Sequence, residues 1–177
     1  KGVDVLLKSL AIVRRKRALT ACLVGDGPDS AEFKTLAETL GLGALVEFPG
    51  RLPTAQALRR GRLLVLPSRA ESFPYVVLEA AAGRVPMIAS DVGGIPEILP
   101  AKNLCPPDNP EALARHIEMA LAILRHGLLA FRQLADGQGG ALVPRREALV
   151  DHRGQAFLDF VRKDEIHFRH RRDAGRV

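Results

Sequence analysis

The stretch Glu71-Ser-Phe-Pro-Tyr-Val-Val-Leu-Glu79 decides how the whole chain is interpreted. It follows an apolar run, Leu63-Leu-Val-Leu-Pro67, which is typical of a strand buried in a parallel sheet. Pro74 suits the first turn of the helix that follows, and Gly83 suits its end. This order places Glu71 in a strand-to-helix loop at the carboxyl edge of the sheet, where open α/β folds bind their ligands.

The helix after Pro74 carries one acidic residue among apolar ones. Its apolar residues are expected to be packed over most of the helix circumference: Val76, Val77, Leu78, Ala80, Ala81 and Ala82. The carboxylate of Glu79 would be costly to desolvate there unless a partner binds it. Backbone N–H groups of residues 75–77 would point out of the helix start and favour an anion. An anion site flanked by the carboxylates of Glu71 and Glu79 fits the chemistry of a sugar joined to a diphosphate.

Helical and extended patterns alternate along residues 1–125. Helices are expected at residues 3–13, 29–40, 54–60, 71–82, 95–99 and 110–124, with Glu71 itself in the loop that leads into its helix. Strands are expected at residues 18–24, 46–48, 63–66, 85–90 and 104–105. Such alternation predicts an α/β fold with a doubly wound parallel sheet that helices cover on both faces.

Glu71 and Glu79 resemble the paired glutamates, with seven residues between them, of the group-1 retaining glycosyltransferases, which have the two-domain GT-B fold. Other segments agree with that family in order and spacing: Lys1-Gly-Val-Asp-Val-Leu-Leu7, Leu23-Val-Gly-Asp-Gly-Pro28, Val46-Glu-Phe-Pro-Gly50, Ala89-Ser-Asp-Val-Gly-Gly-Ile-Pro-Glu97 and Pro106-Pro-Asp-Asn-Pro-Glu-Ala-Leu113. The resemblance covers residues 1–125 and implies the Rossmann-like, donor-binding C-terminal domain of such an enzyme.

The resemblance also implies a role for each candidate residue. Glu71, the predicted catalytic residue, would accept hydrogen bonds from the donor sugar, and Glu79 would bind the ribose hydroxyls of the nucleotide. Lys1 matches the lysine that binds the diphosphate. The backbone of Leu52 would contact the nucleobase. The remaining predicted donor-binding residues are Phe73, Pro74, Tyr75, Val76, Gly93 and Gly94.

Each of these assignments has a structural alternative. Glu71 could cap the next helix, and Glu79 could reach solvent from a helix face. Lys1 could be a mobile terminal residue, and Gly93-Gly94 could serve a simple turn. Pro74 removes a backbone N–H close to the expected diphosphate, which leaves the identity of the donor sugar open.

The implied function is hexosyl transfer with retention, from a nucleotide-diphosphate sugar to a saccharide or a lipid-linked glycan, as in polysaccharide biosynthesis. The donor is a substrate, and neither a metal nor a cofactor is expected. In the resembled family an N-terminal domain holds the acceptor, so the chain alone is expected to bind a donor weakly and to transfer nothing. The alternatives are a non-catalytic nucleotide-binding fragment and a nucleotide-sugar epimerase of GT-B type.

Net charge and aromatic content indicate which kinds of binding partner suit the chain. The 177-residue chain has a net charge of +6, one Tyr and no Trp. The lack of stacking aromatics disfavours nucleic acid, and a solvated surface or a peripheral contact with an acidic membrane explains the charge better. No apolar run is long enough to span a membrane, so a cytoplasmic location, with contact at the inner face of the membrane, is expected. Cys22 and Cys105 lie in apolar runs and are expected to be buried, and the five His lack metal-ligand spacing.

Both ends of the chain depart from the family pattern. The sequence begins on a helix, so the first strand of the sheet is expected upstream of Lys1. Residues 126–177 form a divergent basic tail that is expected to be partly helical, with a loop at 133–140 and a helix at 147–162. A rearranged or frameshifted C-terminus is an alternative explanation of this tail.

Overall fold

The computed structural model describes residues 1–137 and 155–159. Its strands are β1 (Thr20–Val24), β2 (Val46–Gly50), β3 (Leu63–Leu66), β4 (Met87–Ser90), β5 (Leu104–Cys105) and β6 (Gln155–Asp159). Its helices are α1 (Val3–Arg14), α2 (Ser30–Thr39), α3 (Thr54–Leu58), α4 (Tyr75–Ala82) and α5 (Pro110–Gly137), with 3₁₀ turns η1 (Ile95–Glu97) and η2 (Ala101–Asn103). These elements confirm the predicted alternation of strands and helices.

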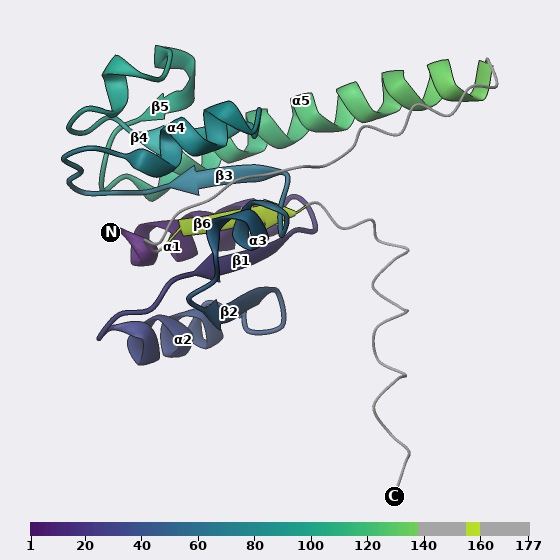
Figure 1. Ribbon diagram of the computed structural model, residues 1–177. Helices are drawn as coiled ribbons and strands as arrows, with labels where there is room; N and C mark the ends of the chain where they lie inside the picture. The colour runs from purple at the N-terminus through teal and green to yellow at the C-terminus, as the bar shows by residue number, and fades with distance from the viewer. Residues whose placement is uncertain (138–154, 160–177) are drawn as a thin grey trace, which may run out of the picture.

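The strands form one sheet in the order β2-β1-β6-β3-β4-β5 (Figure 1). β1 pairs with β2, β3 with β4 and β4 with β5, and all of these pairs are parallel. The carboxyl ends of β1 to β5 therefore meet at one edge of the sheet, and the loops that follow them lie there together. The predicted α/β fold with parallel strands is confirmed.

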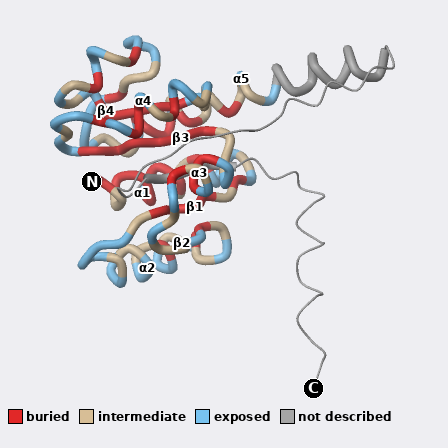
Figure 2. The backbone as a smooth tube through the Cα atoms, in the orientation of Figure 1, coloured by how far each residue is buried: buried red, intermediate tan, exposed pale blue. Residues whose placement is uncertain are grey.

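Helices cover both faces of the sheet, as the doubly wound fold requires. Side chains of β3 alternate between two hydrophobic clusters: Leu63 and Val65 pack with α1, α2 and α5, whereas Leu64 and Leu66 pack with α3 and α4. Every residue of β3 and β4 is buried, and both strands are red, the colour of buried residues, in Figure 2. A strand buried on both faces has to be apolar throughout, which explains the run at residues 63–66.

The sequence-based prediction of a helix at 147–162 is wrong at residues 155–159, which form β6. This strand runs antiparallel to both neighbours, with Ala21 of β1 opposite Leu158 and Leu64 of β3 opposite Phe157. It takes the position that the first strand has in the doubly wound order 3-2-1-4-5-6. Here β1 and β3 each present an edge of backbone N–H and C=O groups, and only an extended segment can pair with both edges. The rest of the predicted helix lies outside the described residues.

The predicted ends of α4 and α5 also need correction. α4 begins at Tyr75 rather than at residue 71, and its outer side is open: Leu78, Ala81 and Ala82 are exposed, because the helix packs on the sheet by one face only. α5 continues to Gly137 through the segment where a loop was expected from residue 133. Strong helix formers continue past residue 124, and they outweigh one internal glycine. Residues 138–140 of the predicted loop lie outside the described part.

Within the described residues, no helix combines the length and the apolar character needed to cross a membrane.

Candidate functional site

The candidate site is a cluster at the carboxyl edge of the sheet. Residues 67–74 leave β3 and lead to α4, and Pro67 and Ser68 at the start of this loop are buried. The Nζ atom of Lys1 lies 2.7 Å from Oε2 of Glu71, and the Ser68 hydroxyl is 3.4 Å from the same oxygen. We refer to Lys1, Gly2, Ser68, Glu71 and Gly93 as the carboxyl-edge cluster. The structure thus brings together two predicted site residues that are 70 positions apart in the sequence.

The residue after Lys1 packs tightly against the loop that follows β3. Gly2 has a φ of 74°, and a Cβ atom at this position would overlap the carbonyl oxygen of Pro67. The carbonyl of Gly2 accepts the first hydrogen bond of α1, from the N–H of Leu6 at 3.1 Å. Only glycine combines this left-handed backbone with so close an approach. Gly2 therefore anchors the backbone at the start of α1, directly after Lys1, whose side chain is 44% exposed.

Gly93 brings the loop after β4 against the loop after β3. Its φ is 54°, and an added Cβ would overlap the backbone carbonyl of Glu71. A Cβ on Gly94 would lie 3.4 Å from the carbonyl oxygen of Ser72, which is ordinary van der Waals contact or slightly closer. Gly93 therefore serves more than a turn, because it allows the backbone that carries Glu71 to pack directly on its neighbour.

The two glutamates differ in their surroundings. The side chain of Glu71 is only 12% exposed. Pro74 occupies the N-cap of α4 and no side chain caps that end, so the alternative of Glu71 as a helix cap is wrong. Glu79 is half-buried on α4, and its Oε2 atom is shielded from solvent. The expected packing of this helix over most of its circumference is wrong, because α4 is open on its outer side.

The start of α4 offers fewer outward N–H groups than the sequence suggested. The N–H of Tyr75 donates to the carbonyl of Phe73 at 3.1 Å, and the N–H of Val77 donates to the carbonyl of Pro74 at 2.9 Å. Pro74, with φ −87° and ψ 78°, is the N-cap residue of α4, and its carbonyl accepts the bond from Val77. The prediction of outward N–H groups is wrong for Tyr75 and Val77, and it stays a prediction for Val76.

Two aromatic side chains on the surface follow Glu71 closely in the sequence. Phe73 and Tyr75 are 51% and 60% exposed, and their rings meet edge to face with centroids 4.9 Å apart. This arrangement is favourable for aromatic pairs and leaves an exposed apolar surface at the start of α4. Leu52, by contrast, is half-buried and packs against the hydrophobic cluster beneath α3 and α4. Its backbone contact with a nucleobase stays a prediction.

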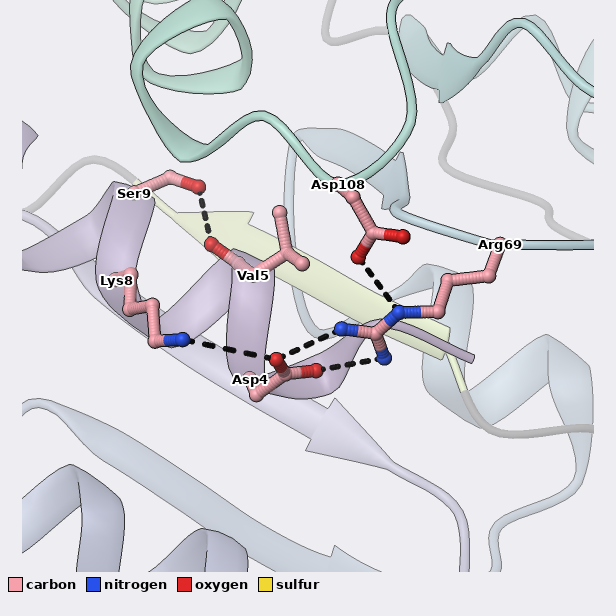
Figure 3. A network of polar contacts seen from close by, with 6 residues as sticks. All are labelled: Asp4, Val5, Lys8, Ser9, Arg69 and Asp108. Atoms are coloured by element: carbon pink, nitrogen blue, oxygen red, sulfur yellow. Dashed lines mark hydrogen bonds and ion pairs between the residues drawn. The ribbon is translucent and has the colours of Figure 1, made fainter.

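A charged network next to the cluster was missed by the sequence analysis (Figure 3). Arg69 donates from Nη1 and Nη2 to the two carboxylate oxygens of Asp4, at 2.9 and 2.8 Å, and from Nε to Asp108 at 2.6 Å. The hydrogen bonds from Arg69 lower the pKa of the Asp4 carboxyl and outweigh the opposing effect of its burial. These residues are 65 and 39 positions apart, so no local pattern could have revealed the network.

The other candidate groups have structural roles. Burial raises the pKa of Cys22, and it raises that of Cys105 to about 11, which keeps both thiols protonated at neutral pH. The predicted burial of both is confirmed. His116 lies on α5 with Nδ1 2.9 Å from the carbonyl oxygen of Ala112. In the part of the chain that the structure describes, no group of three or more His, Cys, Asp and Glu could hold a metal ion.

A family model and several curated proteins match most of this chain. The family model described as "Glycosyl transferases group 1" matches residues 1–122, which include the carboxyl-edge cluster and the Arg69 network but not β6. A component of the phosphatidylinositol N-acetylglucosaminyltransferase of Arabidopsis thaliana is 33% identical over 130 residues, which cover 70% of this chain and 29% of that protein. N-acetyl-alpha-D-glucosaminyl L-malate synthase of Bacillus anthracis is 42% identical over 100 residues, which cover 56% of this chain and 26% of that protein.

Solved structures agree with the sequence relatives. HepE of Anabaena, solved in complex with UDP, aligns with a TM-score of 0.59 and 27% identity, over 69% of this chain and 36% of that chain. A glycosyltransferase from Rickettsia africae has a TM-score of 0.62 over 70% of this chain and 35% of its own, and at 24% identity it shows the fold alone. The chain thus spans less than a third of the curated relatives named above, and 35–36% of these two solved chains.

Proposed function

Because the chain belongs to the group 1 glycosyl transferases, we propose that its carboxyl-edge cluster binds the donor of a sugar transfer, a nucleotide-diphosphate sugar. The observation that carries this proposal is the 2.7 Å pair between Lys1 and Glu71 at the carboxyl edge of the sheet. An ammonium group suits diphosphate oxygens, and a carboxylate suits the hydroxyls of a sugar. A bound donor could use both groups at once.

Uridine diphosphate is the nucleotide that we propose. The support is the solved structure of HepE in complex with UDP, which is 27% identical to this chain. Glu79 would accept hydrogen bonds from the ribose hydroxyls, since its carboxylate is half-buried on the helix that leads away from Glu71. Lys1 would leave Glu71 in part as the diphosphate arrives, so that the carboxylate becomes available to the sugar.

The proposed reaction is hexosyl transfer with retention. The bond between the anomeric carbon and a phosphate oxygen breaks, and its electron pair stays on the diphosphate. The acceptor hydroxyl oxygen bonds to the same face of that carbon and gives its proton to the departing phosphate oxygen. Lys1 would stabilise the charge that develops on the diphosphate, and Glu71 would fix the orientation of the sugar. No step uses a metal ion.

The acceptor belongs to the proposal as well. We propose a saccharide or a lipid-linked glycan, because the name of the Arabidopsis relative describes sugar transfer to phosphatidylinositol. A second domain, as the resemblance to the family implies, would hold it against the donor site. A cytoplasmic location next to a membrane suits such an acceptor.

The class of ligand is tested by calorimetric titration with UDP and, in the same salt, with a single-stranded RNA. Saturable binding of UDP and no saturable binding of RNA are expected. The reverse result would assign the basic surface to nucleic acid and would contradict the proposal. A thermal-shift panel of nucleotide sugars then ranks the donor base and sugar.

Glu79→Gln is expected to weaken UDP binding by about 1–3 kcal/mol, the range for hydrogen bonds to charged groups. The amide keeps the shape of the side chain but has one acceptor oxygen in place of two. The free energy of unfolding should change by less than about 1 kcal/mol, because Glu79 is only half-buried. Calorimetry and urea denaturation measure the two quantities. Unchanged binding with a large loss of stability would make Glu79 a structural residue.

Glu71→Ala is expected to leave UDP affinity unchanged or slightly higher, because Lys1 loses its carboxylate partner and is released to the diphosphate. Affinity for the matching UDP-sugar relative to UDP should fall, since the hydroxyls of the sugar lose their acceptor. Titrations of both ligands against both proteins give the ratio. Equal losses for UDP and UDP-sugar would show that Glu71 only shapes the loop.

A further inference from the structure

Arg69 occupies a position from which it can control the carboxyl-edge cluster without belonging to it. It lies next to Ser68 and two residues before Glu71, in the loop after β3. Its fork binds Asp4, which is in the first turn of α1, three residues after Lys1. One side chain thus connects the segment that carries the lysine with the segment that carries the carboxylate (Figure 3).

The third bond of Arg69 fixes the guanidinium itself. Its Nε donates to Asp108, in the loop between β5 and α5, at 2.6 Å. Asp108 has a φ of 51°, a left-handed conformation that aspartate tolerates better than most residues. The next residue, Asn109, caps α5 through its side-chain oxygen, which accepts a bond from the N–H of Ala112 at 2.8 Å. Asp108 is thus attached to the start of a long helix, which gives Arg69 a rigid support.

The geometry requires arginine rather than a cation in general. Two N–H groups of the planar guanidinium donate to the two carboxylate oxygens of Asp4. A third N–H group of the same guanidinium donates to Asp108. A lysine has one ammonium nitrogen on a flexible stem and cannot reproduce this planar set of donors. Lys8, the other cation near Asp4, lies 3.8 Å from it and is on α1 itself, so it connects nothing across elements.

On the basis of the function proposed above, we propose that Arg69 is a positioning residue for the diphosphate site. It holds the first turn of α1 against the loop after β3, and this contact fixes the place of Lys1 relative to Glu71. Arg69 itself is occupied by two carboxylates, so it acts on the ligand through Lys1 rather than by direct contact.

The test compares a ligand that carries the diphosphate with one that lacks it. Affinities for UDP and for uridine are measured by calorimetry for the wild-type chain, Arg69→Gln and Arg69→Lys. Arg69→Gln should lower UDP affinity by roughly tenfold, because a displaced Lys1 loses its charge-assisted contact with the diphosphate, and should leave uridine affinity unchanged. Arg69→Lys should recover only part of the loss, because the fork is absent. Equal losses for UDP and uridine, or no loss of either, would overturn the proposal.

A double-mutant cycle distinguishes positioning from general stability. In a Lys1→Gln background, Arg69→Gln should have no further effect on UDP affinity, because the group that it positions is gone. A full additional loss in that background would show that Arg69 acts elsewhere. Arg60→Gln is the matched control, since Arg60 is equally exposed and pairs with Glu47 at 3.2 Å on the far part of the sheet. It should change neither affinity.

Hydrogen exchange measures the effect of Arg69 on the first turn of α1 without any ligand. The amide of Leu6 donates to the carbonyl of Gly2 in the first turn of α1, and its hydrogen exchange reports how firmly this turn is held. Exchange at Leu6 should be several-fold faster in Arg69→Gln than in the wild type and unchanged in Arg60→Gln. If the wild-type chain does not bind UDP, the proposed function fails, and unchanged exchange at Leu6 would separately overturn the positioning role.

Discussion

Gly93→Ala is expected to unfold the chain at a clearly lower denaturant concentration and to abolish UDP binding by the fraction that stays folded. The backbone at Gly93 has a φ of 54°, which costs a residue with a Cβ about 1–2 kcal/mol. The new methyl group would also overlap the carbonyl of Glu71, and moving that backbone adds roughly 1–3 kcal/mol, typical of overpacking. Because the backbone that must move carries Glu71, the loss of stability and the loss of the site have the same cause.

Alanine substitutions at two other glycines separate the cost of the positive φ from the cost of the steric overlap. Gly50 has a φ of 76° and open space around its Cβ direction, so Gly50→Ala should cost only the backbone term of about 1–2 kcal/mol. Gly27 has neither a positive φ nor a neighbour within 4 Å, so Gly27→Ala should change stability by less than about 1 kcal/mol. Urea denaturation of the three variants tests the ranking. A Gly93→Ala variant no less stable than Gly50→Ala would mean that the two loops do not pack as described.

Phe157→Pro is expected to be the other severely destabilising substitution. Residue 157 lies in the middle of β6, opposite Cys22 of β1 and Leu64 of β3. In a strand paired on both edges, each N–H faces one neighbour or the other, so proline always removes a ladder bond. The buried carbonyl left without its donor costs about 1–3 kcal/mol. The loss of pairing also exposes two strand edges, which favours self-association.

Glu111→Pro is the matched control for the proline substitution. Glu111 is an exposed residue in the first turn of α5, where a helix tolerates proline because the N–H groups there have no partner within the helix. Thermal unfolding and light scattering should show a lower midpoint and association for Phe157→Pro, with neither change for Glu111→Pro. Equal stability of the two variants would contradict the placement of β6 in the sheet.

The local pattern of the sequence was sufficient for the first five strands and for the helices between them. Runs such as residues 63–66 are apolar because both faces of their strand are covered, and this burial leaves a direct trace in the sequence. The sequence predicted separate donor-binding roles for Lys1 and Glu71, and the structure brings the two side chains within 2.7 Å of each other. Gly2 and Gly93, which lie in two other segments that resemble the family, have backbone conformations and contacts that only glycine allows.

The features that the sequence could not predict depend on contacts between distant segments. Residues 155–159 carry a weak helical pattern, and pairing with two strand edges overrides it. Arg69 is one of 26 basic residues, and nothing near it in the sequence points to Asp4 or Asp108. The open outer side of α4 follows from how the helix packs on the sheet, whereas its apolar composition predicts packing over most of its circumference.

The central place of β6 also bears on the order in which the chain folds. The parallel pairs β1–β2 and β3–β4 join strands that are close in sequence, whereas β6 pairs Gln155 with Val24 and Ala156 with Val65. Closing such long loops is entropically unfavourable before their contacts form, and contacts of high sequence separation slow folding. Two half-sheets, β2-β1 and β3-β4-β5, can therefore assemble first from local contacts, and the antiparallel strand joins them last. A nascent chain would have to be synthesised past residue 159 before its sheet could close.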